Sequence, residues 1–201
     1  MTLWDERFAG EDYLFGEAPN AFLARQTAWL KPGQRALAVA DGEGRNGVWL
    51  AEQGLSVHSV DSSAVAQEKA RRLAARRHVS LDLELVDLLA WPFPEGAYDV
   101  VVAIFIQFTG PAARTLMFEA MKGALRPGGL LLLEGYRPEQ IAYGTGGPSQ
   151  VENLYTEDLL RAAFADFEIV ALDAYDAQIE EGTRHKGTSA LIDLVARKPL
   201  A

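Results

Sequence analysis

The chain has 201 residues, of which 49% are hydrophobic and 23% charged, and it contains no cysteine. This length and balance are typical of one globular domain, and the lack of cysteine excludes disulfides, zinc–thiolate sites and cysteine nucleophiles. The formal net charge of −9 argues against a nucleic-acid partner, which requires a basic face. The sequence shows neither a signal peptide nor an apolar run near the ~20 residues that cross a bilayer. We therefore expect a cytoplasmic protein with no membrane partner.

The hydrophobic pattern predicts alternating helices and strands through the first two thirds of the chain. In chain order we expect a helix at 21–30, a strand at 35–40, a helix at 46–53, a strand at 55–60, a helix at 64–77, strands at 81–86 and 98–105, a helix at 111–125 and a strand at 130–134. The strand at 98–105 is continuously apolar, which indicates burial on both faces. This alternation implies crossover connections and a mostly parallel, doubly wound sheet.

The last third of the chain follows a different pattern. A long glycine-containing loop at 136–153 precedes a helix at 156–164, with Thr156 as its N-cap. Strands at 167–175 and 189–197 follow without a helix between them, so we expect an antiparallel pair at one edge of the sheet. The whole pattern predicts a Rossmann-like three-layer α/β/α sandwich, with a mostly parallel seven-stranded sheet and an antiparallel strand near the C-terminal end.

A glycine-rich loop joins the first predicted strand to its helix. Residues Gly42 to Gly47 match the pattern G-x-G-x-x-G, and Asp61 ends the second strand 19 positions after Gly42. Glycines let the backbone approach a nucleoside closely, and a carboxylate beyond the second strand accepts hydrogen bonds from ribose hydroxyls. The pattern is shared by nicotinamide and flavin dinucleotide sites and by S-adenosylmethionine sites, and a tight turn without a ligand can also produce it.

Asp87 favours S-adenosylmethionine among these ligands. It follows the third strand, where a carboxylate can accept a hydrogen bond from an adenine amino group at the carboxyl edge of the sheet. The apolar strand at 98–105 and the turn at 125–130 follow in an order and spacing that support the same interpretation. Taken alone, the first indicates only a buried strand and the second only a turn.

Together these features resemble the class I S-adenosylmethionine-dependent methyltransferases over nearly the whole chain. Within that family the sequence looks most like the small bacterial group that includes the tellurite-resistance methyltransferases. The segments that carry the resemblance are Trp4-Asp5-Glu6-Arg7-Phe8, Tyr13-Leu14-Phe15-Gly16, Gly42-Glu43-Gly44-Arg45-Asn46, Asp61, Asp87, the turn at 126–130 and Thr145-Gly146-Gly147-Pro148.

The resemblance implies a role for each matched position. Gly42 and Gly44 would lie against the methionine and ribose parts of S-adenosylmethionine, Asp61 would bind the ribose and Asp87 the adenine, and Phe105 would border the reacting sulfur. The full implied cofactor set is Trp4, Tyr13, Asp41, Gly42, Glu43, Gly44, Arg45, Asn46, Asp61, Ser62, Asp87, Leu88, Ile104 and Phe105. The chain would form a single domain over 1–201, with an N-terminal lid and helix (1–30), a cofactor-binding core (31–135) and a substrate-side part (136–201).

Three positions depart from the family pattern. The family usually carries an acidic residue where this chain has Ala38, a glycine where it has Ala40, and a small residue where it has Asp41. The change at Ala38 removes a carboxylate that usually supports the methionine end of the cofactor, and Asp41 is the candidate to replace it.

The methyl acceptor is less clearly indicated. We expect His185, Arg184 and Tyr136 to be catalytic and Gln107, Arg137, Thr145, Gly146 and Lys186 to bind the substrate, while His58 and His78 are structural and no metal is involved. The expected activity is methyl transfer from S-adenosylmethionine, with S-adenosylhomocysteine as product, to a small molecule such as an oxyanion, a thiol or another small nucleophile, by a monomer or homodimer. An NAD(P)- or flavin-linked oxidoreductase and a non-catalytic S-adenosylmethionine-binding module remain as alternatives.

Overall fold

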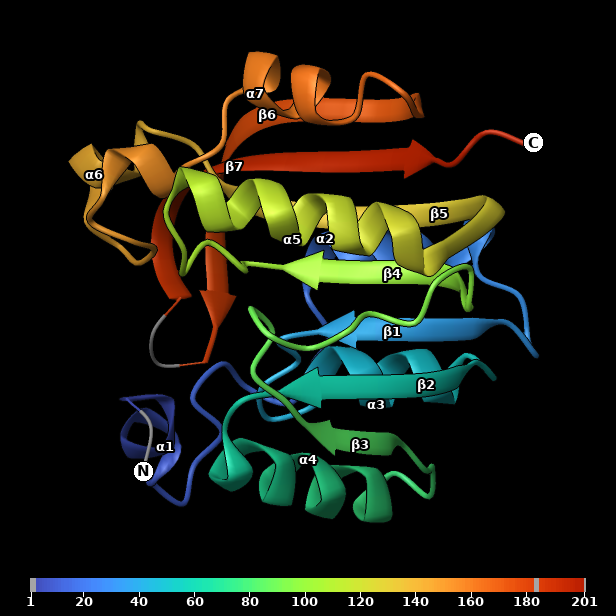
Figure 1. Ribbon diagram of the computed structural model, residues 1–201. Helices are drawn as coiled ribbons and strands as arrows, with labels where there is room; N and C mark the ends of the chain where they lie inside the picture. The colour runs from blue at the N-terminus through green and yellow to red at the C-terminus, as the bar shows by residue number, and fades with distance from the viewer. Residues whose placement is uncertain (1–2, 183–184, 201) are drawn as a thin grey trace.

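A seven-stranded sheet forms the centre of the molecule (Figure 1). The computed structural model describes residues 3–182 and 185–200. The strands are β1 (Arg35–Val39), β2 (Ser56–Asp61), β3 (Asp82–Leu85), β4 (Tyr98–Ile104), β5 (Leu125–Tyr136), β6 (Glu168–Glu181) and β7 (His185–Arg197). Their order across the sheet is β3-β2-β1-β4-β5-β7-β6. The first five strands are parallel, and β7 runs antiparallel to both β5 and β6, so the predicted fold class is confirmed.

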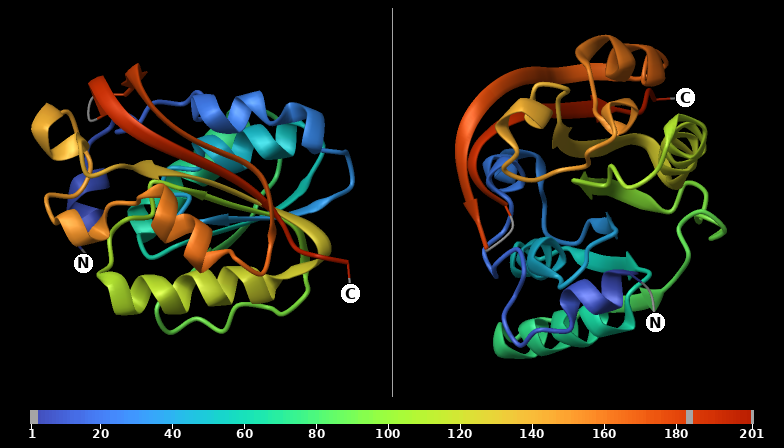
Figure 2. Two further views of the ribbon diagram at one scale, coloured as in Figure 1. Left: turned by 90° about the horizontal axis from the view of Figure 1, so that it is seen from above. Right: turned by 90° about the vertical axis from the view of Figure 1, so that its left-hand side faces the viewer.

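Helices cover both faces of this sheet (Figure 2). They are α1 (Leu3–Phe8), α2 (Ala21–Arg25), α3 (Arg45–Glu52), α4 (Ala64–Arg76), α5 (Pro111–Ala124), α6 (Gln140–Tyr143) and α7 (Glu157–Ala163), with short 3-10 turns η1 (Thr27–Trp29) and η2 (Val151–Asn153). Side chains alternate between the faces of each strand. Leu37 and Val39 of β1 therefore pack in the cluster that contains α5 and α7, whereas Ala36 and Ala38 pack in the cluster that contains α2 and α3.

The parallel core matches the predicted elements closely except at β5, which begins at Leu125 and includes the segment 126–129 that was predicted to be a turn; its pairing with β4 is irregular there. The other differences lie mainly at the two ends of the chain. The start is not irregular, because α1 forms there, and the predicted helix at 21–30 is interrupted between α2 and η1. The predicted loop at 136–153 contains α6 and η2. The last two strands are longer than expected, and their pairing extends to Glu181 opposite His185.

The extension of β6 and β7 matters for the site. The two strands bend together beyond the sheet toward the side where α1 lies (Figures 1 and 2), and the parallel strands end on that side. Polar residues alternate along this part of β6, so the pattern there has no continuous apolar run that would predict a buried strand. Across residues 3–182 and 185–200, no helix is long and apolar enough to cross a membrane.

Candidate functional site

A cavity of about 320 Å³ lies at the carboxyl ends of the parallel strands. Ligands bind at this edge in open α/β sheets because the loops that leave the strands diverge there. The residues that line the cavity come from the N-terminal segment, the glycine loop, the ends of β2 and β4, the segment after β3, and the start of β7. They are Trp4, Phe8, Phe15, Ala40, Asp41, Gly42, Arg45, Asn46, Asp61, Ser62, Asp87, Leu88, Leu89, Ile104, Phe105, Phe108 and His185.

The glycine loop needs its glycines for two different reasons. Gly42 has φ +57° and lines the cavity, in a left-handed conformation that glycine adopts without steric cost. Gly44 does not line the cavity. It precedes α3 with φ +84°, and a Cβ added there would lie 2.6 Å from the Cβ of Ala70 on α4. Gly42 thus allows a left-handed turn in the cavity wall, whereas Gly44 allows α3 and α4 to pack closely.

Asp61 is held at the cavity wall by backbone amides. Its Oδ2 accepts a hydrogen bond from the Gly42 N–H at 2.9 Å and its Oδ1 accepts one from the Ser63 N–H at 2.8 Å. Burial raises the pKa of Asp61, although these amide hydrogen bonds oppose the shift. A carboxylate can accept about four hydrogen bonds, so each oxygen retains capacity for a ligand hydroxyl. This arrangement fits a ribose.

The residues after β3 and β4 fit an adenine. Asp87 is exposed and lines the cavity, and its Oδ1 accepts a hydrogen bond from the Leu89 N–H at 3.0 Å. The apolar side chains of Leu88 and Ile104 line the same cavity. A flat apolar base with a polar edge requires this combination of apolar walls and a few placed acceptors.

Asp41 lies in the cavity wall, but its carboxylate is bound internally. It is 9% exposed, and its oxygens accept hydrogen bonds from the Gly47 N–H at 3.1 Å and the Ser59 hydroxyl at 2.8 Å. Burial raises the pKa of Asp41 from 3.8 to about 7 despite both hydrogen bonds. Ala40, where the family usually has glycine, adopts φ +51°, a conformation that costs a non-glycine residue roughly 1–2 kcal/mol.

Glu43 and Tyr13 lie outside the cavity and fasten the N-terminal segment to α4. The Glu43 carboxylate is 2.7 Å from Lys69 Nζ and accepts a hydrogen bond of 2.7 Å from the Leu14 N–H. The Tyr13 hydroxyl donates to the Lys69 carbonyl at 2.8 Å. These two residues, which the resemblance assigned to cofactor contact, instead hold the segment that brings Trp4, Phe8 and Phe15 to the cavity.

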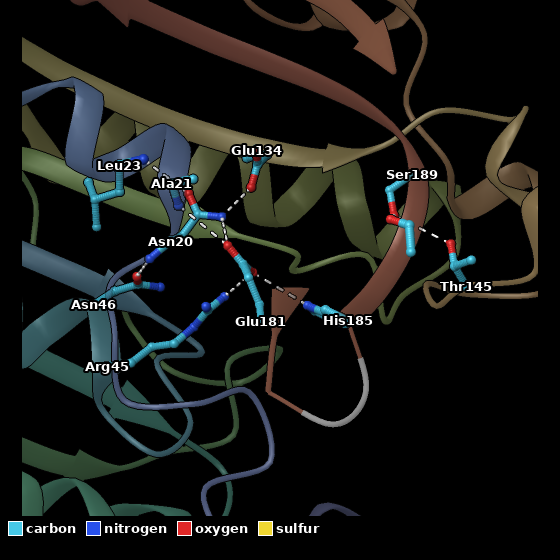
Figure 3. A network of polar contacts seen from close by, with 11 residues as sticks. Asn20, Ala21, Leu23, Arg45, Asn46, Glu134, Thr145, Glu181, His185 and Ser189 are labelled. Atoms are coloured by element: carbon cyan, nitrogen blue, oxygen red, sulfur yellow. Dashed lines mark hydrogen bonds and ion pairs between the residues drawn. The ribbon is translucent and has the colours of Figure 1, made fainter. Parts of the chain in front are cut away.

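His185 lies in the wall next to a buried ion pair (Figure 3). Arg45 Nη2 is 2.7 Å from Glu181 Oε2, and His185 Nδ1 is 3.7 Å from the same oxygen. Burial alone would raise the pKa of Glu181, but the proximity of His185 and Arg45 lowers it to about 2. Burial lowers the pKa of His185, so its ring is neutral near pH 7, and there Arg45 supplies the charge that keeps Glu181 ionised.

Asn20 connects this ion pair to the sheet (Figure 3). Its side-chain amide donates to Glu134 of β5 and, at 3.1 Å, to Glu181. Its Oδ1 accepts the Leu23 N–H at 3.0 Å as the N-cap of α2, and its N–H donates to Asn46 Oδ1 at 2.9 Å. Through its side chain and its backbone N–H, this one buried residue therefore fixes the relative positions of α2, α3, β5 and β6.

Other predicted catalytic and substrate residues are not in the cavity wall. Tyr136 is 1% exposed, stacks on Phe105 with centroids 4.5 Å apart, and among the described residues its hydroxyl has no hydrogen-bond partner. Burial raises the pKa of Tyr136, which opposes a role for it in proton transfer. Gln107 is buried and donates to the carbonyls of Tyr136 and Asn153, so it braces the backbone after β4 and β5.

The remaining predicted substrate residues lie further along β5, β7 and the α6 segment. Arg137 pairs with Asp176, Thr145 donates to the Thr188 carbonyl at 2.6 Å, and the Gly146 carbonyl accepts a hydrogen bond from Gln140 at 3.1 Å. Lys186 is exposed and does not line the cavity. Arg184 lies outside the described residues.

Six residues near the site were not expected from the sequence. Four are hydrophobic residues that line the cavity, one is the Glu181 carboxylate, and one is the Asn20 amide that links the elements. They are Phe8, Phe15, Leu89, Phe108, Glu181 and Asn20. Phe8 and Phe15 belong to the N-terminal motifs that carry the family resemblance, so the sequence could have indicated them as site residues. Nothing in the sequence indicated Glu181 or Asn20, because the residues they contact are distant in the chain.

Comparisons with known proteins agree with this geometry. Residues 36–129 match the methyltransferase domain family. A demethylmenaquinone methyltransferase from Renibacterium salmoninarum is 30% identical over 131 residues, which are 65% of this chain and 50% of that protein. The chain spans about half the length of the curated relatives it matches.

Solved structures share the whole fold. One, from a study of the conversion of a disulfide bond into a thioacetal group during echinomycin biosynthesis, superposes with a TM-score of 0.78 at 22% identity, covering 98% of this chain and 92% of that one. TehB from Haemophilus influenzae superposes with a TM-score of 0.74 at 17% identity, covering 89% of this chain and 62% of that one. The sequence of residues 36–129 is that of a methyltransferase domain, and the chain shares its fold with these solved structures. The cofactor that this match implies is S-adenosylmethionine.

Proposed function

We propose that this protein transfers the methyl group of S-adenosylmethionine to a small-molecule acceptor, with His185 as the general base. The observation that supports this most strongly is the convergence of Gly42, Asp61 and Asp87 on one cavity that His185 also lines. The oxidoreductase alternative shares the glycine loop and Asp61, but the match of residues 36–129 to a methyltransferase domain disfavours it.

The cavity residues fit the cofactor part by part. Asp61 would accept hydrogen bonds from the ribose hydroxyls and Asp87 from the adenine amino group, with Leu88 and Ile104 against the base. When bound, S-adenosylmethionine supplies a methyl carbon made electrophilic by its positively charged sulfur. The protein's contribution is alignment and exclusion of water. The N-terminal segment that carries Trp4, Phe8 and Phe15 would act as the lid that completes this enclosure.

His185 is the residue proposed to accept the acceptor's proton. Its Nδ1 is buried, 3.7 Å from Glu181 Oε2 and without a hydrogen-bond partner among the described residues, which leaves Nε2 as the nitrogen able to reach an acceptor. Its neutral ring near pH 7 suits a base. His185→Ala should abolish most acceptor turnover while leaving S-adenosylhomocysteine binding within about threefold, since a single base contributes roughly 100-fold or more. His78→Ala, at the end of α4, is the matched control. Unchanged turnover in His185→Ala would contradict the assignment.

Calorimetric titration with S-adenosylhomocysteine tests the cofactor site. The wild type should bind, and Asp61→Asn should bind about tenfold or more weakly, because one charge-assisted acceptor contributes roughly 1.5–3 kcal/mol. Asp82→Asn, at the amino end of β3, controls for the loss of one carboxylate. No heat of binding in the wild type would refute the proposal, and heat with NADH instead would favour an oxidoreductase. Binding without transfer to any acceptor would indicate a non-catalytic module.

A further inference from the structure

The part of the cavity around His185 is formed by aromatic rings. The centroid of the His185 ring lies 4.4 Å from that of Phe15 and 4.7 Å from that of Phe105. Trp4 stacks on Phe8 at 5.7 Å, and Phe8 meets Phe15 edge-on at 6.2 Å. These rings come from α1, the segment after it, the end of β4 and the start of β7. They form a continuous apolar wall that favours an apolar ligand through burial and dispersion.

The charges in the cavity wall disfavour an anionic ligand. Asp61 and Asp87 carry carboxylates there, whereas Arg45 is the only arginine or lysine among the described residues that line the cavity. Arg45 is already paired with Glu181 at 2.7 Å, and both side chains are about one-tenth exposed. Among the described residues that line the cavity, an acceptor with a full negative charge would therefore meet two carboxylates and no unpaired cationic side chain.

The basicity of His185 sets a lower limit on the acidity of the acceptor group. The His185 ring is 8% exposed and packs against the Phe15 and Phe105 rings, and its buried Nδ1 has no hydrogen-bond partner among the described residues. These surroundings disfavour an added proton, and burial lowers the pKa of His185, so its Nε2 is a weak base. A weak base removes a proton efficiently only from a group that is itself fairly acidic. A thiol or a phenol meets this requirement, and an aliphatic alcohol does not.

We propose that the acceptor is an uncharged, largely apolar molecule that carries an acidic X–H group, a thiol or a phenol. This rests on the proposed function. The X–H proton passes to His185 Nε2, the freed electron pair of X forms the new bond to the methyl carbon, and the pair of the breaking carbon–sulfur bond stays on sulfur. The acceptor therefore becomes anionic only inside the aromatic enclosure. The charges of the described lining residues disfavour an oxyanion as the natural acceptor.

Binding of neutral and charged probes to the protein saturated with S-adenosylhomocysteine tests this assignment. Para-cresol and para-hydroxybenzenesulfonate share a phenol ring and differ in one anionic group. By calorimetry we expect para-cresol and benzyl mercaptan to bind about tenfold or more tightly than the sulfonate or tellurite. Phe15→Ala should weaken para-cresol binding about tenfold, whereas Tyr143→Ala, an aromatic deletion outside the cavity, should not.

Turnover measurements test the need for an acidic acceptor group separately from the shape of the acceptor. Benzyl mercaptan and benzyl alcohol differ only in the atom that carries the proton, so methyl transfer to the mercaptan should exceed transfer to the alcohol by about 100-fold or more. Tighter binding of the sulfonate or tellurite than of para-cresol, or no binding of either neutral probe, would overturn the acceptor class. Equal transfer to mercaptan and alcohol would overturn the requirement for an acidic group. Failure of S-adenosylhomocysteine itself to bind would instead refute the proposed function.

Discussion

The buried carboxyl of Asp41 should make the stability of the folded protein depend on pH. Its pKa is raised from 3.8 to about 7, chiefly by burial. A group whose pKa is raised on folding stabilises the folded state below its unfolded pKa, and this stabilisation is lost as the pH rises through the folded pKa. The contribution of Asp41 should therefore fall between about pH 4 and pH 7, as the folded protein is forced to hold a buried negative charge.

Asn is a good substitute because it resembles the protonated acid. Its oxygen can still accept the Gly47 N–H, and its amide can donate to the Ser59 hydroxyl, the two partners that Asp41 has now. One pH unit corresponds to about 1.4 kcal/mol, and about two units separate pH 5 from the folded pKa. Relative to the wild type, Asp41→Asn should thus gain about 2–3 kcal/mol of unfolding free energy between about pH 5 and pH 8.

Urea unfolding followed by circular dichroism at both pH values measures this gain. The other titrating groups are present in both proteins and cancel in the difference, apart from those close enough to Asp41 to be coupled to it. Asp82→Asn, an exposed carboxylate on β3, controls for the general effect of removing one negative charge. An Asp41→Asn difference of the same size at the two pH values would show that the buried carboxyl does not titrate in this window, and the reasoning would be wrong.

Two further substitutions test the packing and the ion pair. Gly44→Ala should cost about 2–4 kcal/mol, because the new Cβ would lie 2.6 Å from Ala70 Cβ at φ +84°. Gly123→Ala in α5, where nothing lies within 4 Å, should gain about 0.5–1 kcal/mol in the same urea assay. Glu181→Gln should cost roughly 3 kcal/mol near pH 7, and the cost should shrink as the pH falls from 4.5 toward about 2, where wild-type Glu181 also becomes protonated. The exposed Glu180→Gln is its control, and a pH-independent loss would contradict the assigned ionisation.

The parallel core and the cofactor side of the cavity were predictable because their signals are local. β1 and β4 are mainly apolar runs, β2 and β3 interleave apolar and polar residues, and glycine, proline or charged residues mark the ends of these strands. The ends of neighbouring parallel strands meet at one edge, so Asp61 and Asp87 had to lie close together once the alternation was recognised. The same reasoning placed Gly42 at that edge.

The acceptor side depends on contacts between distant parts of the chain. Arg45 and Glu181 are 136 positions apart, and they meet because β6 and β7 extend and bend over the end of the sheet. The alternating polar residues of that extension are equally compatible with an exposed hairpin, so no periodicity predicted the bend. Two residues expected at the site, Tyr136 from its place at the end of the fifth strand and Glu43 by resemblance, point instead into the interior and toward α4.

Local hydrophobic periodicity thus decides which segments form strands and helices, and parallel topology then decides which strand ends meet. How the wall around His185 is assembled depends instead on burial and ion pairing between segments far apart in the chain. The contacts of Asn20 with Glu134 and Glu181 are one example. Such contacts cannot be predicted from the hydrophobic pattern of either segment, because that pattern does not distinguish these polar residues from exposed ones.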